Sequence, residues 1–124
     1  MIKTLIIENE LASAEHLASM INNSFPEIEI VDVCETAEEG INAIQKNLPE
    51  LVFMDIQLDD DKTAFDIISN LGKVDFEIIF TTAYDKYAKQ AFRVSALDFL
   101  EKPMDKNDLT EAIIKYKKKQ AKGI

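Results

Sequence analysis

The stretch "LVFMDIQLDDD", residues 51–61, places one aspartate directly after four large apolar residues. Such an apolar run, residues 51–54, is typical of a strand that is buried on both faces, as in parallel sheets. Asp55 lies where this strand leaves the core. Its carboxylate is therefore either solvated at the edge of a sheet or held in a cleft for chemistry, and the rest of the chain decides between the two.

Short apolar runs alternate with amphipathic segments of helical length along the whole chain. The patterns predict strands at residues 4–7, 28–34, 51–55, 77–82 and 96–101. They predict helices at residues 11–21, 36–47, 64–72, 85–94 and 105–119. Thr36 and Glu39 form the pattern of a capping box, and Gly72 marks a helix end. Five strands, each followed by a helix, predict a doubly wound α/β fold with a five-stranded parallel sheet and helices on both faces.

The composition is that of one globular domain of 124 residues. The single cysteine, Cys34, excludes an internal disulfide bond and suits a small buried apolar residue in a reducing compartment. No apolar run approaches the roughly 20 residues of a membrane span. The first residues, "MIKTLII", lack the cleavage site of a secretory signal. We therefore expect a cytoplasmic domain that has no contact with a membrane.

The charge is unevenly distributed. The net charge is −9, and five of the 14 basic residues follow Ile114 without an acidic residue, so residues 1–114 carry −14. This balance argues against nucleic-acid binding by the domain itself. The basic run at residues 115–122 could be a nucleic-acid arm, but such a run is more often the solvated end of a last helix, which we favour.

Polar residues follow four of the predicted strands at their carboxyl ends: Glu8 and Asn9, Asp55, Thr82 and Lys102. In parallel sheets these ends share one rim, where ligands bind. Carboxylate oxygens suit a hard cation such as Mg²⁺, while a lysine and a threonine hydroxyl can bind phosphoryl oxygens. An aspartate at such a site can act as a nucleophile towards phosphorus. The rim therefore predicts a phosphoryl-transfer site around Asp55.

Four stretches resemble the receiver domains of two-component response regulators: "LIIENE", "LVFMDIQL", "IIFTTAYDKYAKQAF" and "ALDFLEKP". The last two resemble the receivers of LytTR-type transcription regulators in particular. The resemblance covers residues 3–117 and implies the flavodoxin-like receiver fold, with strand order 2-1-3-4-5. It implies a receiver domain at residues 1–120, with residues 121–124 as the start of a linker or tail.

The resemblance also implies roles for individual residues. Asp55 corresponds to the aspartate that accepts a phosphoryl group from a sensor histidine kinase. Lys102 corresponds to the phosphoryl-binding lysine, and Thr82 and Phe99 to the two switch residues. The implied Mg²⁺ ligands are Glu8, Asn9, Asp55 and the backbone carbonyl of Gln57, and the bond between Lys102 and Pro103 is a candidate cis peptide.

The chain departs from the family pattern at two places. Asn9 stands where the family usually has an aspartate that binds Mg²⁺ directly, so the metal affinity is expected to be lower. The loop after Asp55 reads "DDDKTA" and is one residue longer than usual. We expect Asp59, Asp60 and Asp61 to form an exposed loop without a catalytic role.

The leading interpretation is a phosphorylation-dependent switch that controls a C-terminal DNA-binding domain absent from this chain. Such a receiver catalyses its own phosphorylation and dephosphorylation but is no turnover enzyme. The fourth helix, fifth strand and fifth helix are expected to form a homodimer contact, with charges from Lys86, Lys89, Arg93, Asp98, Glu101 and Asp108.

Two alternatives remain open. The first, favoured by Asn9, is a pseudo-receiver that acts as a phosphorylation-independent interaction module. The second is a phosphatase with an aspartyl-phosphate intermediate, although Gln57 stands where its acid/base residue would be needed.

Overall fold

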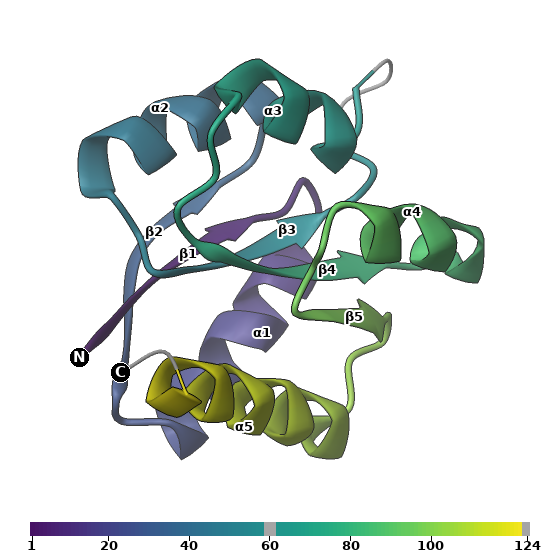
Figure 1. The fold of residues 1–124 in the computed structure, drawn as a ribbon. Coiled ribbons are helices and arrows are strands. Elements are labelled where there is room, and N and C mark those ends of the chain that lie inside the picture. The colour runs from purple at the N-terminus through teal and green to yellow at the C-terminus, as the bar shows by residue number, and fades with distance from the viewer. Residues whose placement is uncertain (59–61, 123–124) are drawn as a thin grey trace.

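The computed structural model describes residues 1–58 and 62–122, and its centre is a five-stranded parallel sheet (Figure 1). The strands are β1 (Ile2–Ile7), β2 (Ile28–Cys34), β3 (Leu51–Asp55), β4 (Glu77–Thr82) and β5 (Asp98–Glu101). The helices are α1 (Leu11–Ser24), α2 (Ala37–Asn47), α3 (Ala64–Leu71), α4 (Ala88–Arg93) and α5 (Lys106–Lys122), with a 3₁₀ turn η1 (Asp85–Tyr87) before α4. The strand order is β2-β1-β3-β4-β5, which confirms the predicted doubly wound fold.

The sheet separates two apolar cores. Helices α1 and α5 cover one face, and α2, α3 and α4 cover the other (Figure 1). Successive residues of β3 point to opposite faces, so Val52 and Met54 enter the core beneath α2 and α3, whereas Leu51 and Phe53 enter the core beneath α1 and α5. All five residues of β3 are buried, as the apolar run predicts.

Local capping fixes the helix ends. The Thr36 hydroxyl accepts a hydrogen bond from the Glu39 backbone N–H at 3.1 Å, which confirms Thr36 as the N-cap of α2. The second half of the predicted capping box differs, because the Glu39 carboxylate accepts the N–H of Glu35 at 3.3 Å. Gly72 ends α3 with a φ of 73°, a conformation that glycine adopts at little cost.

Several predicted boundaries differ in the structure. The first strand, β1, begins at Ile2 instead of residue 4, and α1 continues to Ser24 instead of ending at residue 21. The helix predicted from residue 85 begins as the 3₁₀ turn η1, and its α-helical part starts at Ala88. The fifth strand begins at Asp98 instead of residue 96. Ala96 donates its N–H to the carbonyl of Ala91 at 3.2 Å and so closes the end of α4 after the left-handed Ser95.

Three of the five basic residues near the end of the chain form ion pairs with acidic residues that lie in strands or next to them. Lys115 lies 3.2 Å from Asp98, and Lys119 lies 2.8 Å from Glu77. Lys117 pairs with Glu27 on the other side of α5. This arrangement supports the interpretation of the basic run as part of the last helix, and α5 continues to Lys122, beyond the expected domain boundary at residue 120.

Within residues 1–58 and 62–122, no helix combines the length and the apolar character that crossing a membrane requires. Cys34 is a free, buried cysteine, as expected.

Candidate functional site

The predicted rim residues lie at the carboxyl ends of their strands. Glu8 follows β1 directly, Asp55 is the last residue of β3, Thr82 is the last residue of β4, and Lys102 follows β5. Asp55 and Thr82 are buried, with exposed fractions of 4% and 1%. Neither of these side chains is solvated at an open sheet edge, so the cleft interpretation of Asp55 holds.

The ammonium group of Lys102 lies among three carboxylates. Its Nζ atom is 2.5 Å from Glu8 Oε1, 3.0 Å from Asp55 Oδ2 and 3.0 Å from Glu10 Oε1. Glu8 and Asp55 are buried, whereas Glu10 closes the cluster from the solvent side with 64% of its side chain exposed. Buried carboxylates require such a partner, because an uncompensated charge in the interior is costly. With all four groups ionised, the cluster keeps a net charge of −2.

The surroundings shift the pKa values of this cluster. Burial and the neighbouring Glu8 raise the pKa of Asp55 to about 7, although Lys102 opposes both effects. Burial alone would lower the pKa of Lys102, but its pairs with Glu8, Glu10 and Asp55 raise the pKa above its usual range. Lys102 is therefore positively charged at every physiological pH, and the excess negative charge around it favours a second cation.

The donor set fits Mg²⁺. Carboxylate oxygens of Glu8, Glu10 and Asp55 all lie within 4.8 Å of one another. These are the hard oxygen ligands that Mg²⁺ prefers, and a magnesium site commonly uses one or two carboxylates together with water.

Glu10 was not predicted as a site residue. It precedes α1 in an extended conformation, with φ −96° and ψ 114°. Residues i and i+2 of an extended segment point to the same side, so Glu10 reaches the same cluster as Glu8. The alternation of acids in "ENE" was the signal that could have identified it.

Two other predicted metal ligands have different positions. Asn9 is exposed, between Glu8 and Glu10. Gln57 donates its backbone N–H to Asp55 Oδ1 at 3.3 Å, and its side chain donates to the Tyr87 hydroxyl at 2.9 Å. Metal binding by Asn9 and by the Gln57 carbonyl stays a prediction. Asp59, Asp60 and Asp61 lie outside the described residues.

The two expected switch residues lie on neighbouring strands. The Thr82 hydroxyl accepts the backbone N–H of Tyr84 at 3.2 Å, which ties it to the loop after β4. Phe99 is half-buried on β5 and lines a cavity of about 210 Å³ between β5 and α4, together with Ala91 and Phe92. The peptide bond between Lys102 and Pro103 is cis.

Comparison with known proteins agrees with this geometry. The family model described as "Response regulator receiver domain" matches residues 4–114. The chain is 37% identical over 126 residues to the sensory transduction protein LytT of Bacillus anthracis, covering 100% of this chain and 50% of that protein. It is 35% identical to the transcriptional regulatory protein BtsR of Escherichia coli strain K12, covering 98% of this chain and 51% of that protein.

A solved structure shows the same fold. The response regulatory domain of protein mrkE from Klebsiella pneumoniae superimposes with a TM-score of 0.86 at 23% identity, covering 98% of this chain and 99% of that chain. The chain spans about half the length of the curated relatives it matches. From the family match and these relatives, we conclude that this chain belongs to the receiver domains of two-component response regulators, with LytT proteins among its relatives.

Proposed function

We propose that this receiver is a phosphorylation-dependent switch in which Asp55 accepts a phosphoryl group from a sensor histidine kinase. The observation that carries the proposal is the buried Asp55 carboxylate, 3.0 Å from the Lys102 ammonium and beside the oxygens of Glu8 and Glu10. Receivers are signalling proteins, so the acyl phosphate formed here is a signal and not a turnover intermediate.

The transfer forms one bond and breaks another. A carboxylate oxygen of Asp55 attacks the phosphorus of the donor's phosphohistidine, the P–N bond breaks, and the donor imidazole takes up a proton from water. Lys102 already lies within hydrogen-bonding distance of this carboxylate. After the transfer, its ammonium group can give up the hydrogen bond to one carboxylate and donate to a phosphoryl oxygen instead. Glu8, Asp55, Asn9 and the Gln57 carbonyl, with Glu10 nearby, would hold Mg²⁺, which would neutralise charge on the transferred group. Hydrolysis of the acyl phosphate by water would return Asp55 to its free state.

The switch would begin at Thr82. Turning its hydroxyl towards a phosphoryl group breaks the bond to the Tyr84 N–H and frees the loop after β4. Phe99 has room to repack, because the cavity of about 210 Å³ lies beside its ring. These changes would reshape the face formed by α4, β5 and α5.

That face is our proposed site of homodimerisation. Phe92 is 85% exposed there, and Lys86, Lys89, Arg93, Glu101 and Asp108 supply charges of both signs. Asp98 already pairs with Lys115 of the same chain at 3.2 Å, so it must exchange this partner before it can join a contact between two copies. Sedimentation at several salt concentrations with a phosphate mimic tests the dimer, and a monomer under all conditions would contradict it.

We propose what this receiver controls from the names and lengths of its relatives. One of them is named a transcriptional regulatory protein, and the relatives are about twice as long as this chain. We therefore propose that this receiver controls a C-terminal DNA-binding domain in the cytoplasm through a linker that follows α5, and not from residue 121 as first expected. The net charge of −9 favours an output that leaves nucleic-acid binding to that other domain.

The decisive experiment is phosphorylation by acetyl phosphate with Mg²⁺, followed by intact-mass measurement. One added phosphate is expected in the wild type and none in Asp55→Asn. A phosphate that persists in Asp55→Asn would place the acceptor elsewhere. A wild type that remains unmodified would favour the pseudo-receiver alternative, which Asn9 supports.

A further inference from the structure

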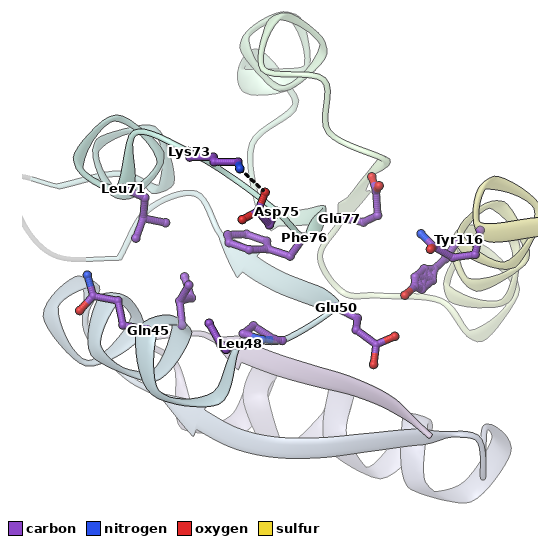
Figure 2. Close-up of a pocket in the computed structure, with 12 residues that line it drawn as sticks. Gln45, Leu48, Glu50, Leu71, Lys73, Asp75, Phe76, Glu77 and Tyr116 are labelled. Carbon is purple, nitrogen blue, oxygen red and sulfur yellow. Dashed lines mark ion pairs between the residues drawn. The ribbon is translucent and has the colours of Figure 1, made fainter. Parts of the chain in front are cut away.

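Lys102 differs from the other paired lysines in its number of partners. Four lysines of the described residues each form an ion pair with a single carboxylate: Lys73, Lys115, Lys117 and Lys119. Figure 2 shows one such pair, in which the Lys73 ammonium lies 3.8 Å from Asp75 among the residues that line a cavity of about 620 Å³. Lys102 instead has three carboxylates within 3.0 Å. Because an ammonium group has three N–H donors, these carboxylates occupy all of them.

Phosphorylation requires one of these donors, so this inference rests on the proposed function of Asp55. A phosphoryl oxygen on Asp55 can accept a hydrogen bond from Lys102 only after one carboxylate has left the ammonium group. Glu8 is poorly suited to leave, because its side chain is 4% exposed and its Oε2 atom also accepts the backbone N–H of Glu10 at 3.0 Å. Moving Lys102 away from Glu8 would leave a buried carboxylate without this cation, which is costly.

Glu10 is the partner that can leave. Its side chain is 64% exposed, and within residues 1–58 and 62–122 Lys102 is the only hydrogen-bond partner of its carboxylate. Water can solvate the released carboxylate, and an ion pair of such exposure contributes little to stability. Glu10 also precedes α1, whose first turn holds no acidic residue, so a negative charge remains favourable at this helix end.

We propose that Glu10 is a placeholder for the phosphoryl group: its carboxylate occupies the Lys102 donor that a phosphoryl oxygen on Asp55 takes over. The exchange moves no proton, because Lys102 remains an ammonium and only hydrogen bonds are replaced. Glu10 must leave before the phosphoryl oxygen is bound, so it slows phosphorylation and stabilises the unphosphorylated receiver. Glu8 and Glu10 thus have separate roles, one as the buried carboxylate that stays with Lys102 and the other as the exposed carboxylate that leaves.

The test compares two substitutions of Glu10 in phosphorylation by acetyl phosphate, followed over time by intact mass. Glu10→Gln keeps the length of the side chain but offers Lys102 only a neutral amide oxygen. Glu10→Asp keeps the charge, but its side chain is one methylene group shorter and does not reach Lys102 at hydrogen-bonding distance. Both variants are expected to react about two- to fivefold faster than the wild type, the range of an exposed ion pair. Saturating Mg²⁺ is required, because both substitutions can also change the Mg²⁺ affinity.

Glu10→Asp separates the placeholder from general repulsion of the anionic donor. If repulsion alone slowed the wild type, Glu10→Asp would react like the wild type and only Glu10→Gln would be faster, which would overturn the proposal. Slower reaction of both variants would also overturn it, because Glu10 would then assist the transfer. Glu15→Gln is the matched control, since Glu15 is exposed on α1 and its substitution changes the net charge as Glu10→Gln does. This control should react at the rate of the wild type.

A binding measurement tests the same exchange without phosphoryl transfer. Beryllium trifluoride, a mimic of the phosphoryl group, is titrated into the ¹⁵N-labelled chain at saturating Mg²⁺, and the amide of Thr82 is followed by nuclear magnetic resonance. Both Glu10 variants should bind the mimic about two- to fivefold more tightly than the wild type. Equal affinity and equal rates in all three proteins would overturn the placeholder and leave the proposed function intact. A wild type and variants that take up neither phosphate nor mimic would overturn both.

Discussion

Gln57 donates a hydrogen bond of 2.9 Å to the hydroxyl of Tyr87, and this bond joins the loop after the phosphoacceptor strand to the turn before α4. The Tyr87 ring also packs against Phe65 of α3, with ring centroids 6.3 Å apart, and the Lys86 ammonium lies 5.2 Å from its centroid. Tyr87 therefore links the loop after β3, through Gln57, to α3 and to the turn before α4.

We expect Tyr87→Phe to loosen this connection without disturbing the aromatic packing. The ring stays, and only the hydroxyl that receives the Gln57 amide is lost. Since the bond is partly solvated, the free energy of unfolding should fall by about 0.5–1 kcal/mol in urea denaturation. Amide hydrogen exchange at residues 57 and 84–88 should become faster than in the wild type. Unchanged exchange there would mean that the ring packing alone holds the turn.

Cys34 provides a prediction about reactivity. Burial, assisted by the negative charges of Asp32 and Glu39, raises the pKa of its thiol to about 12. At pH 8 only about one thiol in ten thousand is then a reactive thiolate. A thiol reagent at pH 8 should therefore modify the folded chain very slowly and the urea-unfolded chain quickly. Rapid modification of the folded chain would show that β2 opens to solvent.

The sequence predicted those parts of the structure that depend on local pattern. The apolar run before Asp55 was sufficient to place β3 in the interior. Thr36 marked the start of α2 because its capping bond is local, and Gly72 marked the end of α3 because glycine adopts a positive φ at little cost. The start of β5 was missed, because it depends on the bond between Ala96 and Ala91, which forms only when α4 ends in a left-handed residue.

Some residues of the candidate site could likewise be predicted from local pattern, whereas others depend on contacts between distant segments. Asp55 and Lys102 could be placed from strand ends, since parallel strands bring their carboxyl ends to one rim. The participation of Glu10 depends on the direction of its side chain in three dimensions and on the reach of Lys102, 92 residues away in the sequence. The pairs of the α5 lysines with Asp98, Glu27 and Glu77 likewise join segments that no local pattern connects.

Asn9 and Glu10 allow a matched pair of metal-binding experiments. Asn9→Asp adds a charge where the family usually has an aspartate, and a direct contact should tighten Mg²⁺ binding by on the order of 1 kcal/mol or more at an effective dielectric near 20. Glu10→Gln removes a charge from the carboxylate cluster and should weaken binding. Calorimetric Mg²⁺ titrations of the three proteins in identical salt make the comparison. If Asn9→Asp binds Mg²⁺ no more tightly than the wild type, residue 9 lies outside the metal's first coordination sphere.

The last prediction concerns the stability of the cluster itself. Without a divalent cation, Asp55 is a buried carboxylate beside Glu8, and one lysine must balance three acids. Because the pKa of Asp55 is raised to about 7, its negative charge is unfavourable in the folded chain. Asp55→Asn removes this charge and keeps a carbonyl oxygen for Lys102, so it should raise the free energy of unfolding by about 1 kcal/mol or more at neutral pH. Saturating Mg²⁺ should reverse the order, because a ligand that binds only the folded state stabilises it by mass action and the wild type binds the ion more tightly. Urea denaturation of both proteins measures the difference between their free energies of unfolding, once with a chelator and once with saturating Mg²⁺. Glu15→Gln, an exposed change within α1 that has the same effect on net charge and lies outside the first turn of its helix, is the control and should change neither free energy of unfolding. If Asp55→Asn is less stable than the wild type in the chelator, then the pair between Lys102 and Asp55 outweighs the repulsion between Asp55 and Glu8.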